Sequence, residues 1–149
     1  MDVKRLLIGF AAGFLATLIF HQGLAFLMHQ MGALPGPPYN MAARPPFGVP
    51  SVLSISFWGG VWGVLLALLL ASRPNWPAIP TAIVFGAVAL TIVALTVVPL
   101  IRGTPIALFD PNRWWRGGLL NGAWGLGTVL LMMLAERVQA GPNTESSTR

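Results

Sequence analysis

The sequence contains no cysteine and very few acidic residues. Without cysteine, disulfide bonds, thiolate metal sites and cysteine nucleophiles are excluded. The acidic residues are Asp2, Asp110, Glu136 and Glu145, and none of them lies inside a long apolar stretch. Proton-coupled and cation-coupled transporters commonly use a carboxylate within the membrane, and hydrolysis by paired carboxylates needs two of them together. The sequence therefore supports neither chemistry.

Charge of either sign is scarce. Charged residues make up 9% of the 149 residues and hydrophobic residues 55%, with a mean hydropathy of +0.72. A soluble domain carries about 25% charged residues, and one with so few would expose large apolar patches and aggregate. The composition thus predicts an integral membrane protein. The net charge of +5 fits basic flanks beside lipid headgroups, and because no basic run is present, we expect no nucleic-acid partner.

Apolar stretches of bilayer length are what the sequence has in abundance. A hydrocarbon core about 30 Å thick needs about 20 residues of helix. Four stretches meet this requirement, at about residues 6–28, 52–71, 78–101 and 117–135. We therefore predict an all-α integral membrane domain of four transmembrane helices over residues 1–138, followed by a disordered polar tail over residues 139–149.

The segments between these stretches carry turn and cap signals. Residues 31–50 include six prolines, which remove backbone donors and favour extended geometry, so this loop should be stiff and non-helical at the membrane surface. Pro50 is placed to open the second helix. The short link at residues 72–77 makes the second and third helices antiparallel neighbours. Asp110 followed by Pro111 is typical of a helix start.

With four spans, both termini and the middle link share one side of the membrane. The basic residues on that side are Lys4, Arg5, Arg73, Arg137 and Arg149, and those on the other side are Arg44, Arg102, Arg113 and Arg116. Five against four is a small excess on the side of the termini, and the first helix usually has the most influence on orientation. We therefore expect both termini to lie in the cytoplasm.

A pattern of small residues and tryptophan occurs twice. Ser56, Gly59, Gly60, Trp62 and Gly63 recur sixty-two positions later as Gly118, Asn121, Gly122, Trp124 and Gly125. The first and third stretches align more loosely at an offset of seventy-three, where Gly13 matches Gly86. Each half holds two helices, so the chain would form two tandem helix hairpins related as an internal parallel repeat. The alternative is coincidence, because glycine and tryptophan are both abundant, with 17 and 6 residues.

Small residues line one face of several predicted helices. In lipid, burial does not drive apolar helices together, whereas close backbone approach does, and small residues permit it. The residues expected to pack helices in this way are Gly9, Gly13, Ser56, Gly59, Gly60, Gly63, Gly118, Gly122 and Gly125. The same faces could instead join copies of the chain into a homo-oligomer or line a path for a small solute.

A few polar side chains lie within the apolar stretches. His21 follows Gly13 and Thr17 at four-residue steps, so it should point into the bundle, with Gln22 on an adjoining face. An ionisable group in the membrane is a functional candidate. The candidate intramembrane polar site therefore consists of His21, Gln22, Thr17 and Asn121. Alternatively, His21 is a neutral structural residue, bonded to Asn121, a threonine or a carbonyl.

No cofactor or metal site is expected. His21 and His29 lie about 12 Å apart along a helix, at 1.5 Å per residue, so they cannot be opposite axial ligands of one haem iron within a chain. Trp124 lies inside the fourth stretch, and its buried indole needs an acceptor. A carbonyl beside a glycine, or Asn121, could accept this hydrogen bond.

Three arginines flank the third and fourth stretches. Arg102, Arg113 and Arg116 could together hold a lipid phosphate or an anionic substrate. Asp110 lies close enough in sequence to form an ion pair with this group. The alternative is that these residues only flank and orient the helices.

Several segments resemble small bacterial inner-membrane proteins of unknown function. They are residues 36–40 (GPPYN), 45–50 (PPFGVP), 57–63 (FWGGVWG) and 114–118 (WWRGG). The resemblance spans most of the chain but is compositional in style. It implies a four-helix protein of the bacterial inner membrane, and it carries over no activity and no site.

Three classes of function follow from these observations. The leading hypothesis is a small multi-pass membrane protein with a structural or accessory role, whose partners are membrane lipids and either further copies of itself or a larger membrane complex. The alternative is an oligomeric transporter or channel for a small solute, with His21, Gln22 and Asn121 lining the path. A redox or lipid-modifying enzyme is disfavoured because the spans lack histidine pairs, carboxylates and cysteine. We therefore do not expect an enzyme.

Overall fold

The structure is a computed structural model that describes residues 2–44 and 47–140, without the side chain of Ala140. Its described part is a bundle of helices with one small two-stranded sheet. The elements in chain order are α1 (Val3–Ala16), the π-helical segment η1 (Thr17–His21), α2 (Gln22–Gln30), β1 (Ala43–Arg44), β2 (Val49–Pro50), α3 (Ser51–Ser72), α4 (Ala78–Val84), the π-helical segment η2 (Phe85–Leu90), α5 (Thr91–Leu95), α6 (Val97–Ile101) and α7 (Pro111–Ala140).

Four continuous helical runs are long and apolar enough to cross a membrane. They are Val3–Gln30, Ser51–Ser72, Ala78–Ile101 and Pro111–Gln139, with 28, 22, 24 and 29 residues. Within the described residues, the prediction of four bilayer-length helices is therefore confirmed. No more than 39% of the apolar window of any run is buried inside the bundle. Most of each run consequently presents apolar side chains outward, as expected for helices that face lipid.

The helix start predicted at Asp110 and Pro111 is confirmed, and it precedes the apolar stretch that begins near residue 117. Asp110 Oδ1 accepts the backbone N–H of Asn112 at 2.9 Å and caps the first turn. Helix α7 continues to Ala140, so the first two residues of the predicted tail are helical. The rest of that tail, residues 141–149, lies outside the described residues.

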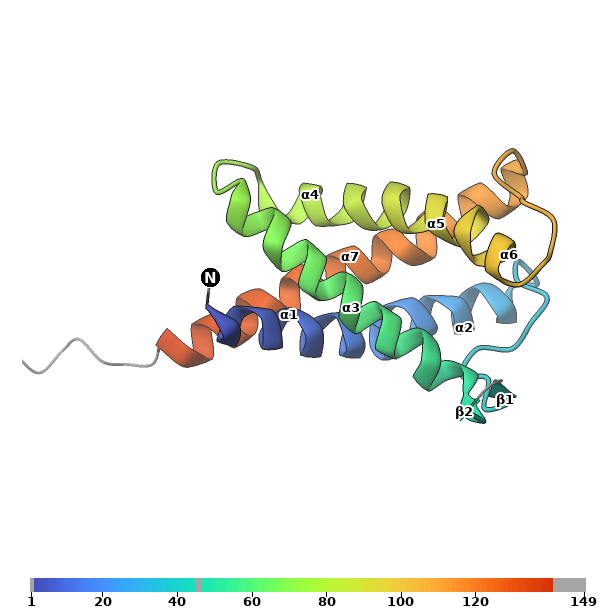
Figure 1. Cartoon of the computed structure of the whole chain (residues 1–149), viewed down its shortest axis with the longest axis horizontal. Coiled ribbons are helices and arrows are strands. Elements are labelled where there is room, and N and C mark those ends of the chain that lie inside the picture. The colour runs from blue at the N-terminus through green and yellow to red at the C-terminus, as the bar shows by residue number, and fades with distance from the viewer. Residues whose placement is uncertain (1, 45–46, 141–149) are drawn as a thin grey trace, which may run out of the picture.

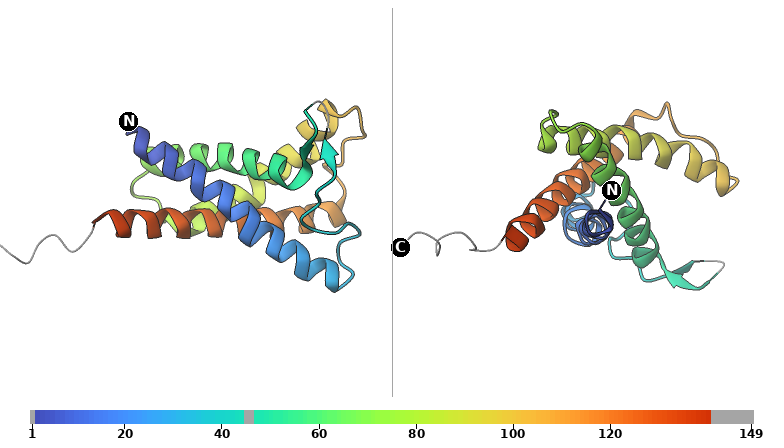
Figure 2. Two further views of the ribbon diagram at one scale, coloured as in Figure 1. Left: turned by 90° about the horizontal axis from the view of Figure 1, so that it is seen from below. Right: turned by 60° about the vertical axis from the view of Figure 1, so that its left-hand side comes forward.

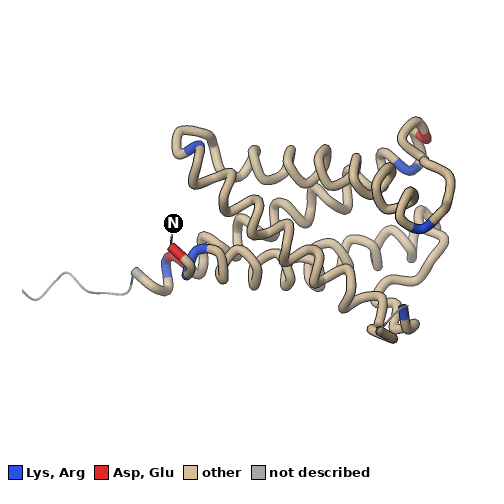
Figure 3. Tube along the Cα trace, viewed as in Figure 1, with Lys and Arg blue, Asp and Glu red and all other residues tan. Residues whose placement is uncertain are grey.

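The four runs are arranged up, down, up and down. In Figure 1, α1 and α4 both start at the left end, whereas α3 and α7 return toward it, and Figure 2 shows the same arrangement from below. The N-terminus and the link between α3 and α4 lie at one end, and the β-hairpin and the loop before α7 lie at the other. Helix α1 packs on α3 and α7, while α4 and η2 pack on α7. The charged residues gather at the two ends and leave the middle of the bundle uncharged (Figure 3).

Three small apolar clusters form the core. Their buried members are Leu66, Leu70, Ala82 and Val129, then Ala12, Ala67 and Met132, then Ala16, Leu90 and Trp124. Each cluster joins side chains from both halves of the chain. The two hairpins therefore share one core and do not fold as separate units.

The described part of the proline-rich loop contains no helix. Ala43 pairs with Pro50 and Arg44 with Val49 in an antiparallel ladder, and Gly48 turns the chain with a φ of 65°. Helix α3 begins at Ser51, directly after Pro50. The predicted non-helical loop and the role of Pro50 at the helix start are thus confirmed.

The third span is broken near its end by Pro99. Proline has no backbone N–H, so the carbonyl of Leu95 lacks its usual helical donor. The N–H of Ala107, in the following loop, donates to that carbonyl instead at 3.0 Å. Thr96, with a φ of −120°, separates α5 from α6. The break therefore pulls the loop before α7 back onto the end of the bundle.

Candidate functional site

Helices α1 and α3 meet backbone to backbone at four glycines. A Cβ atom added to Gly13 would overlap the carbonyl oxygen of Gly59 and lie 2.9 Å from the Cα of Gly63. One added to Gly63 would overlap the carbonyl oxygen of Gly9, and one added to Gly9 would lie 2.8 Å from that of Gly63. The two helices reach this separation only because these positions carry no side chain.

The second hairpin makes the matching contact. A Cβ atom added to Gly86 would overlap the carbonyl oxygen of Asn121 and lie 3.3 Å from the backbone nitrogen of Gly125. One added to Gly125 would overlap the carbonyl oxygen of Ala82. The offsets of seventy-three and sixty-two match Gly86, Asn121 and Gly125 to Gly13, Gly59 and Gly63. Matched positions therefore make matched contacts in the two hairpins.

The other small residues predicted for helix packing have different surroundings. Ser56 is fully buried, and its hydroxyl donates to the carbonyl of Val52 at 2.8 Å. Gly60 lies under the ring of Phe10, which a Cβ atom would approach to 2.7 Å. At Gly122 and Gly118 the nearest atoms to an added Cβ belong to Ala87, at 3.5 and 3.8 Å, which are ordinary contacts. Glycine is therefore sterically required at the close contacts above but not at these last two positions.

A five-residue step in the first span exchanges the places of His21 and Gln22. Buried positions on this span follow at steps of three and four as far as Thr17, and the next buried residue is Gln22, which is 5% exposed. The π-helical segment η1 inserts one residue into the helix here. His21 remains only half-buried. This corrects the expectation that His21 shares the face of Gly13 and Thr17, which assumed unbroken α-helical geometry.

The third span also contains a π-helical segment, η2, at a different place. Two consecutive residues, Leu90 and Thr91, are buried at its end, four and five positions after Gly86. The distance from Gly86 to the buried Leu95 is then nine residues, as is that from Gly13 to Gln22. Each of these two spans therefore holds one π-helical segment, and the two segments do not lie at positions matched by the offset of seventy-three.

Gln22 fastens the proline-rich loop to the first span. Its Oε1 accepts the backbone N–H of Tyr39 at 2.7 Å, and its Nε2 lies 3.4 Å from Nδ1 of His21. The hydroxyl of Tyr39 donates to the carbonyl of Leu18, within η1, at 3.0 Å. Tyr39 has a φ of 53°, a left-handed conformation that costs about 1 kcal/mol or more in a residue other than glycine. Two hydrogen bonds hold it there, so Gln22 positions a loop.

The other predicted polar residues are engaged within their own hairpins. Asn121 donates through Nδ2 to the hydroxyl of Thr91 at 2.9 Å. The hydroxyl of Thr17 donates to the carbonyl of Gly13 at 2.9 Å and lies against Gly59. Each hairpin thus sets a threonine of one span against the glycine-lined contact with the next. The four candidate polar residues therefore do not form one site: Gln22 contacts His21, Thr17 bonds to the backbone of Gly13, and Asn121 bonds to Thr91.

Trp124 fills the centre of the bundle. Its side chain is 1% exposed, and its Nε1 donates to the carbonyl oxygen of Gly13 at 3.0 Å. This confirms that a carbonyl beside a glycine accepts the buried indole. The matching residue, Trp62, packs edge-on against Phe85 with ring centroids 5.9 Å apart, next to Gly86 in sequence. Each hairpin therefore contributes one tryptophan that contacts the other hairpin.

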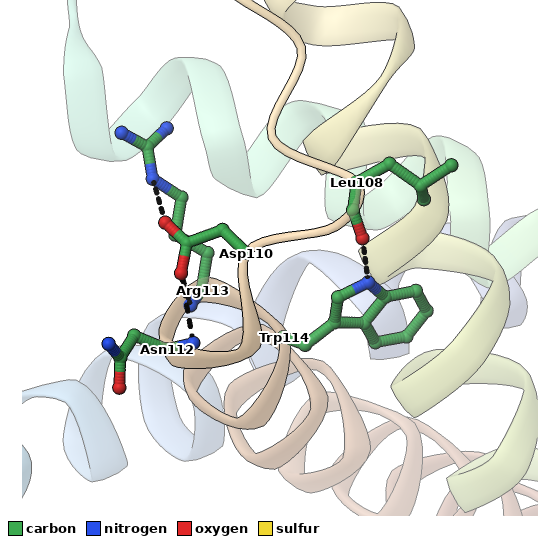
Figure 4. Close-up of polar contacts among 5 residues, drawn as sticks. All are labelled: Leu108, Asp110, Asn112, Arg113 and Trp114. Atoms are coloured by element: carbon green, nitrogen blue, oxygen red, sulfur yellow. Dashed lines mark hydrogen bonds and ion pairs between the residues drawn. The ribbon is translucent and has the colours of Figure 1, made fainter.

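The loop before α7 is organised around Asp110 (Figure 4). The carboxylate forms an ion pair with Nε of Arg113 at 3.2 Å and also accepts the backbone N–H of Asn112. The indole of Trp114 donates to the carbonyl of Leu108. The predicted ion pair between Asp110 and this arginine group is therefore present for Arg113. Both partners are well exposed, so it adds at most about 1 kcal/mol to stability.

The other two arginines of the predicted anion site have separate neighbours. The guanidinium of Arg116 lies 5.5 Å from the ring centroid of Trp115, a cation–π contact. Arg102 is exposed at the end of α6. All three arginines share one end of the bundle, but the contacts of the described residues do not focus them on one point.

The two histidines and the described carboxylates lie apart from one another. In residues 2–44 and 47–140 no group of three or more histidine, aspartate or glutamate residues is placed to hold a metal ion. His29 donates through Nδ1 to the carbonyl of Leu34 at 2.9 Å, which closes the end of α2. Comparison with family models, with curated proteins and with solved structures finds no match to this chain.

Two residues of these hydrogen-bonded groups were not predicted. An offset of seventy-four between the first and third spans, one more than the offset used above, matches Thr91 to Thr17. The extra residue is the one inserted in η2, which the sequence does not reveal. Tyr39 is the only tyrosine in the chain and lies among prolines, which is a weak signal for a contact back to the first span. The omission of Thr91 thus comes from the residue inserted in η2, and that of Tyr39 from the weak signal of the loop.

Proposed function

We propose that this chain is a multi-pass membrane protein with a structural or accessory role, rather than a solute pathway or an enzyme. The observation that carries the proposal is the closed centre of the bundle, where Trp124 is buried and hydrogen-bonded to the backbone of Gly13. The surrounding polar side chains of Thr17, Gln22 and Asn121 are satisfied by partners within the chain. A path through one copy would need these groups to face water.

The proposal includes an internal duplication of a helix hairpin. Its support is that residues matched by the two sequence offsets make the same backbone contacts, and that each hairpin sets a threonine against the equivalent position of its partner helix. Further support is that Gln22 and Leu95, which the offset of seventy-three also matches, are both buried. Because each half has two spans, the axis relating the halves would run along the membrane normal.

The proposed location is the bacterial inner membrane, with both termini in the cytoplasm. Four bilayer-length helices and charges confined to the ends of the bundle support membrane insertion (Figure 3). The inner membrane itself rests on the resemblance to small bacterial membrane proteins. The orientation rests on Lys4 and Arg5 before the first span.

Membrane lipids are the proposed partners, together with further copies of the chain or a larger complex. Gly9, Gly13, Gly59 and Gly63 are occupied within the monomer. A homo-oligomer would therefore form through the outward apolar surfaces rather than through these glycines.

The proposal is tested by measuring solute permeability in liposomes. Purified protein is reconstituted, and osmotic swelling with glycerol and similar small solutes is followed alongside ion conductance. We expect both to equal those of protein-free liposomes. His21→Ala and Asn121→Ala should change only the unfolding midpoint, Asn121→Ala by about 1 kcal/mol because it loses one hydrogen bond in the membrane.

A transporter would give the opposite result. Solute flux that requires the protein and that His21→Ala or Asn121→Ala abolishes would overturn the structural role. The control is Asn112→Ala, an exposed position whose backbone rather than side chain makes the cap bond.

A further inference from the structure

An apolar groove opens on the outer surface where α3 ends and α4 begins. It is a shallow, open depression of about 380 Å³, lined by Leu69, Trp76, Pro77, Pro80, Thr81, Val84 and Phe85. Thr81 is the only polar residue of the lining. Leu69 and Phe85 at the inner side of the groove also pack against the core of the bundle, and the rest of its wall consists of the link and the outer face of α4.

The groove is nearly as long as one leaflet is deep. It runs from the link beside Trp76 to Phe85 at the start of η2. Eight residues of helix from Pro77 to Phe85 rise roughly 12 Å at 1.5 Å per residue. Half of a hydrocarbon core about 30 Å thick is about 15 Å. A single acyl chain that enters beside the link would therefore lie along most of the depth of its leaflet.

The positively charged side chain of Arg73 lies next to Trp76, at the end of the groove formed by the link. The guanidinium of Arg73 lies 5.7 Å from the ring centroid of Trp76, and both side chains are exposed. The ion pair within residues 2–44 and 47–140 joins Arg113 to Asp110, and it lies at the opposite end of the bundle from Arg73. No described carboxylate therefore neutralises Arg73. Tryptophan and arginine at this depth are the residues that meet lipid headgroups.

We propose that this groove binds one anionic phospholipid, with an acyl chain along Val84 and Phe85 and the phosphate on Arg73. Charge complementarity selects an anionic headgroup, and the apolar lining selects a chain rather than a soluble anion. The inference rests on the membrane placement proposed above and names a specific lipid contact within it.

The test uses the full chain in nanodiscs with equal amounts of phosphatidylglycerol and phosphatidylcholine of the same acyl chains. Native mass spectrometry then measures which lipid stays bound. We expect one phosphatidylglycerol to be retained in preference to phosphatidylcholine. Arg73→Gln should reduce this preference about fivefold, the effect of one basic residue at an anionic surface. Val84→Trp should displace the lipid of either headgroup, because the indole fills the groove at a position already 60% exposed.

Arg102→Gln is the matched control, since Arg102 is an exposed arginine at the opposite end. It should leave the preference unchanged. Equal retention of the two lipids by the native chain, or an equal loss in Arg73→Gln and Arg102→Gln, would overturn the proposal. The proposal would also be overturned if Val84→Trp left lipid binding unchanged and altered only the number of protein copies in the complex. The groove would then be a contact site for a helix of another copy. Release of the protein from vesicles by alkaline carbonate would instead refute the membrane placement itself.

Discussion

At the scale of single residues, Gly13 performs two tasks that depend on its lack of a side chain. It lets α1 approach α3 until backbone atoms are in contact, and it leaves its carbonyl oxygen open to the indole of Trp124. The same oxygen accepts the hydroxyl of Thr17. Gly13 thus contributes both to the contact between α1 and α3 and to the contact between α1 and α7. Composition could predict the close contact and the acceptor, because glycine and buried indoles each impose a known requirement.

Alanine at two glycines of the first span should have effects of opposite sign. Gly13→Ala places a Cβ against the carbonyl of Gly59 and should destabilise the fold by about 1–3 kcal/mol, because backbone must move. Gly23 is in the same helical run, and an added Cβ meets nothing within 4 Å. Gly23→Ala should therefore be neutral or stabilise by up to about 1 kcal/mol, since alanine favours the helix. Unfolding in mixed micelles with increasing dodecyl sulfate measures both.

Similar destabilisation by both variants would contradict this interpretation. It would mean that the glycines act through flexibility of the helix rather than through the contact between α1 and α3.

At the scale of elements, hydropathy predicts the four helices but not their internal geometry. In lipid every backbone group must be paired within the segment, so a sufficiently long apolar run becomes a helix. The two π-helical steps do not follow from the run itself. In the first span, η1 lies where Tyr39 of the following loop bonds to Gln22 and Leu18. For this reason the sequence assigns the inward place to His21, whereas the structure gives it to Gln22.

Deleting one residue should have different effects in a π-helical segment and in a regular α-helix. Removing Val88 from η2 should convert this π-helical segment to α-helix. Gly86 and the residues after the deletion should then keep the sides of the helix that they now occupy. Because Val88 is 46% exposed, little packing is lost, and we expect a folded protein within about 2 kcal/mol of the native stability. Helix content by circular dichroism and the unfolding midpoint measure the result.

Leu65 provides the matched deletion in a regular helix. It is 43% exposed and lies in the 22-residue helix α3. Its removal rotates one side of α3 by about 100° relative to the other and turns Leu66 or Gly63 away from its contacts. We expect this variant to lose its fold. Equal damage from the two deletions would show that η2 is not an inserted residue.

At the scale of the whole molecule, the bundle has two ends of different character. One end carries the N-terminus, the short link and the end of α7, and the other carries the two long loops (Figures 1 and 3). Phe47 and Phe109 occupy matched positions in those two loops and are 87% and 92% exposed. Exposed aromatic and basic side chains together at this end suit a membrane surface. The two ends should therefore lie on opposite sides of the bilayer.

The absence of cysteine makes this arrangement directly measurable. Gly36→Cys and Asn112→Cys lie in the regions of the two long loops, Asn75→Cys lies in the short link, and all three positions are exposed. A membrane-impermeant maleimide should label the first two in intact spheroplasts and Asn75→Cys only after permeabilisation, because the proposed orientation puts the link on the cytoplasmic side with the termini. The reverse pattern would invert the orientation and keep four spans. Labelling of Gly36→Cys and Asn112→Cys from different sides would contradict the four-span arrangement, since an even number of crossings separates them.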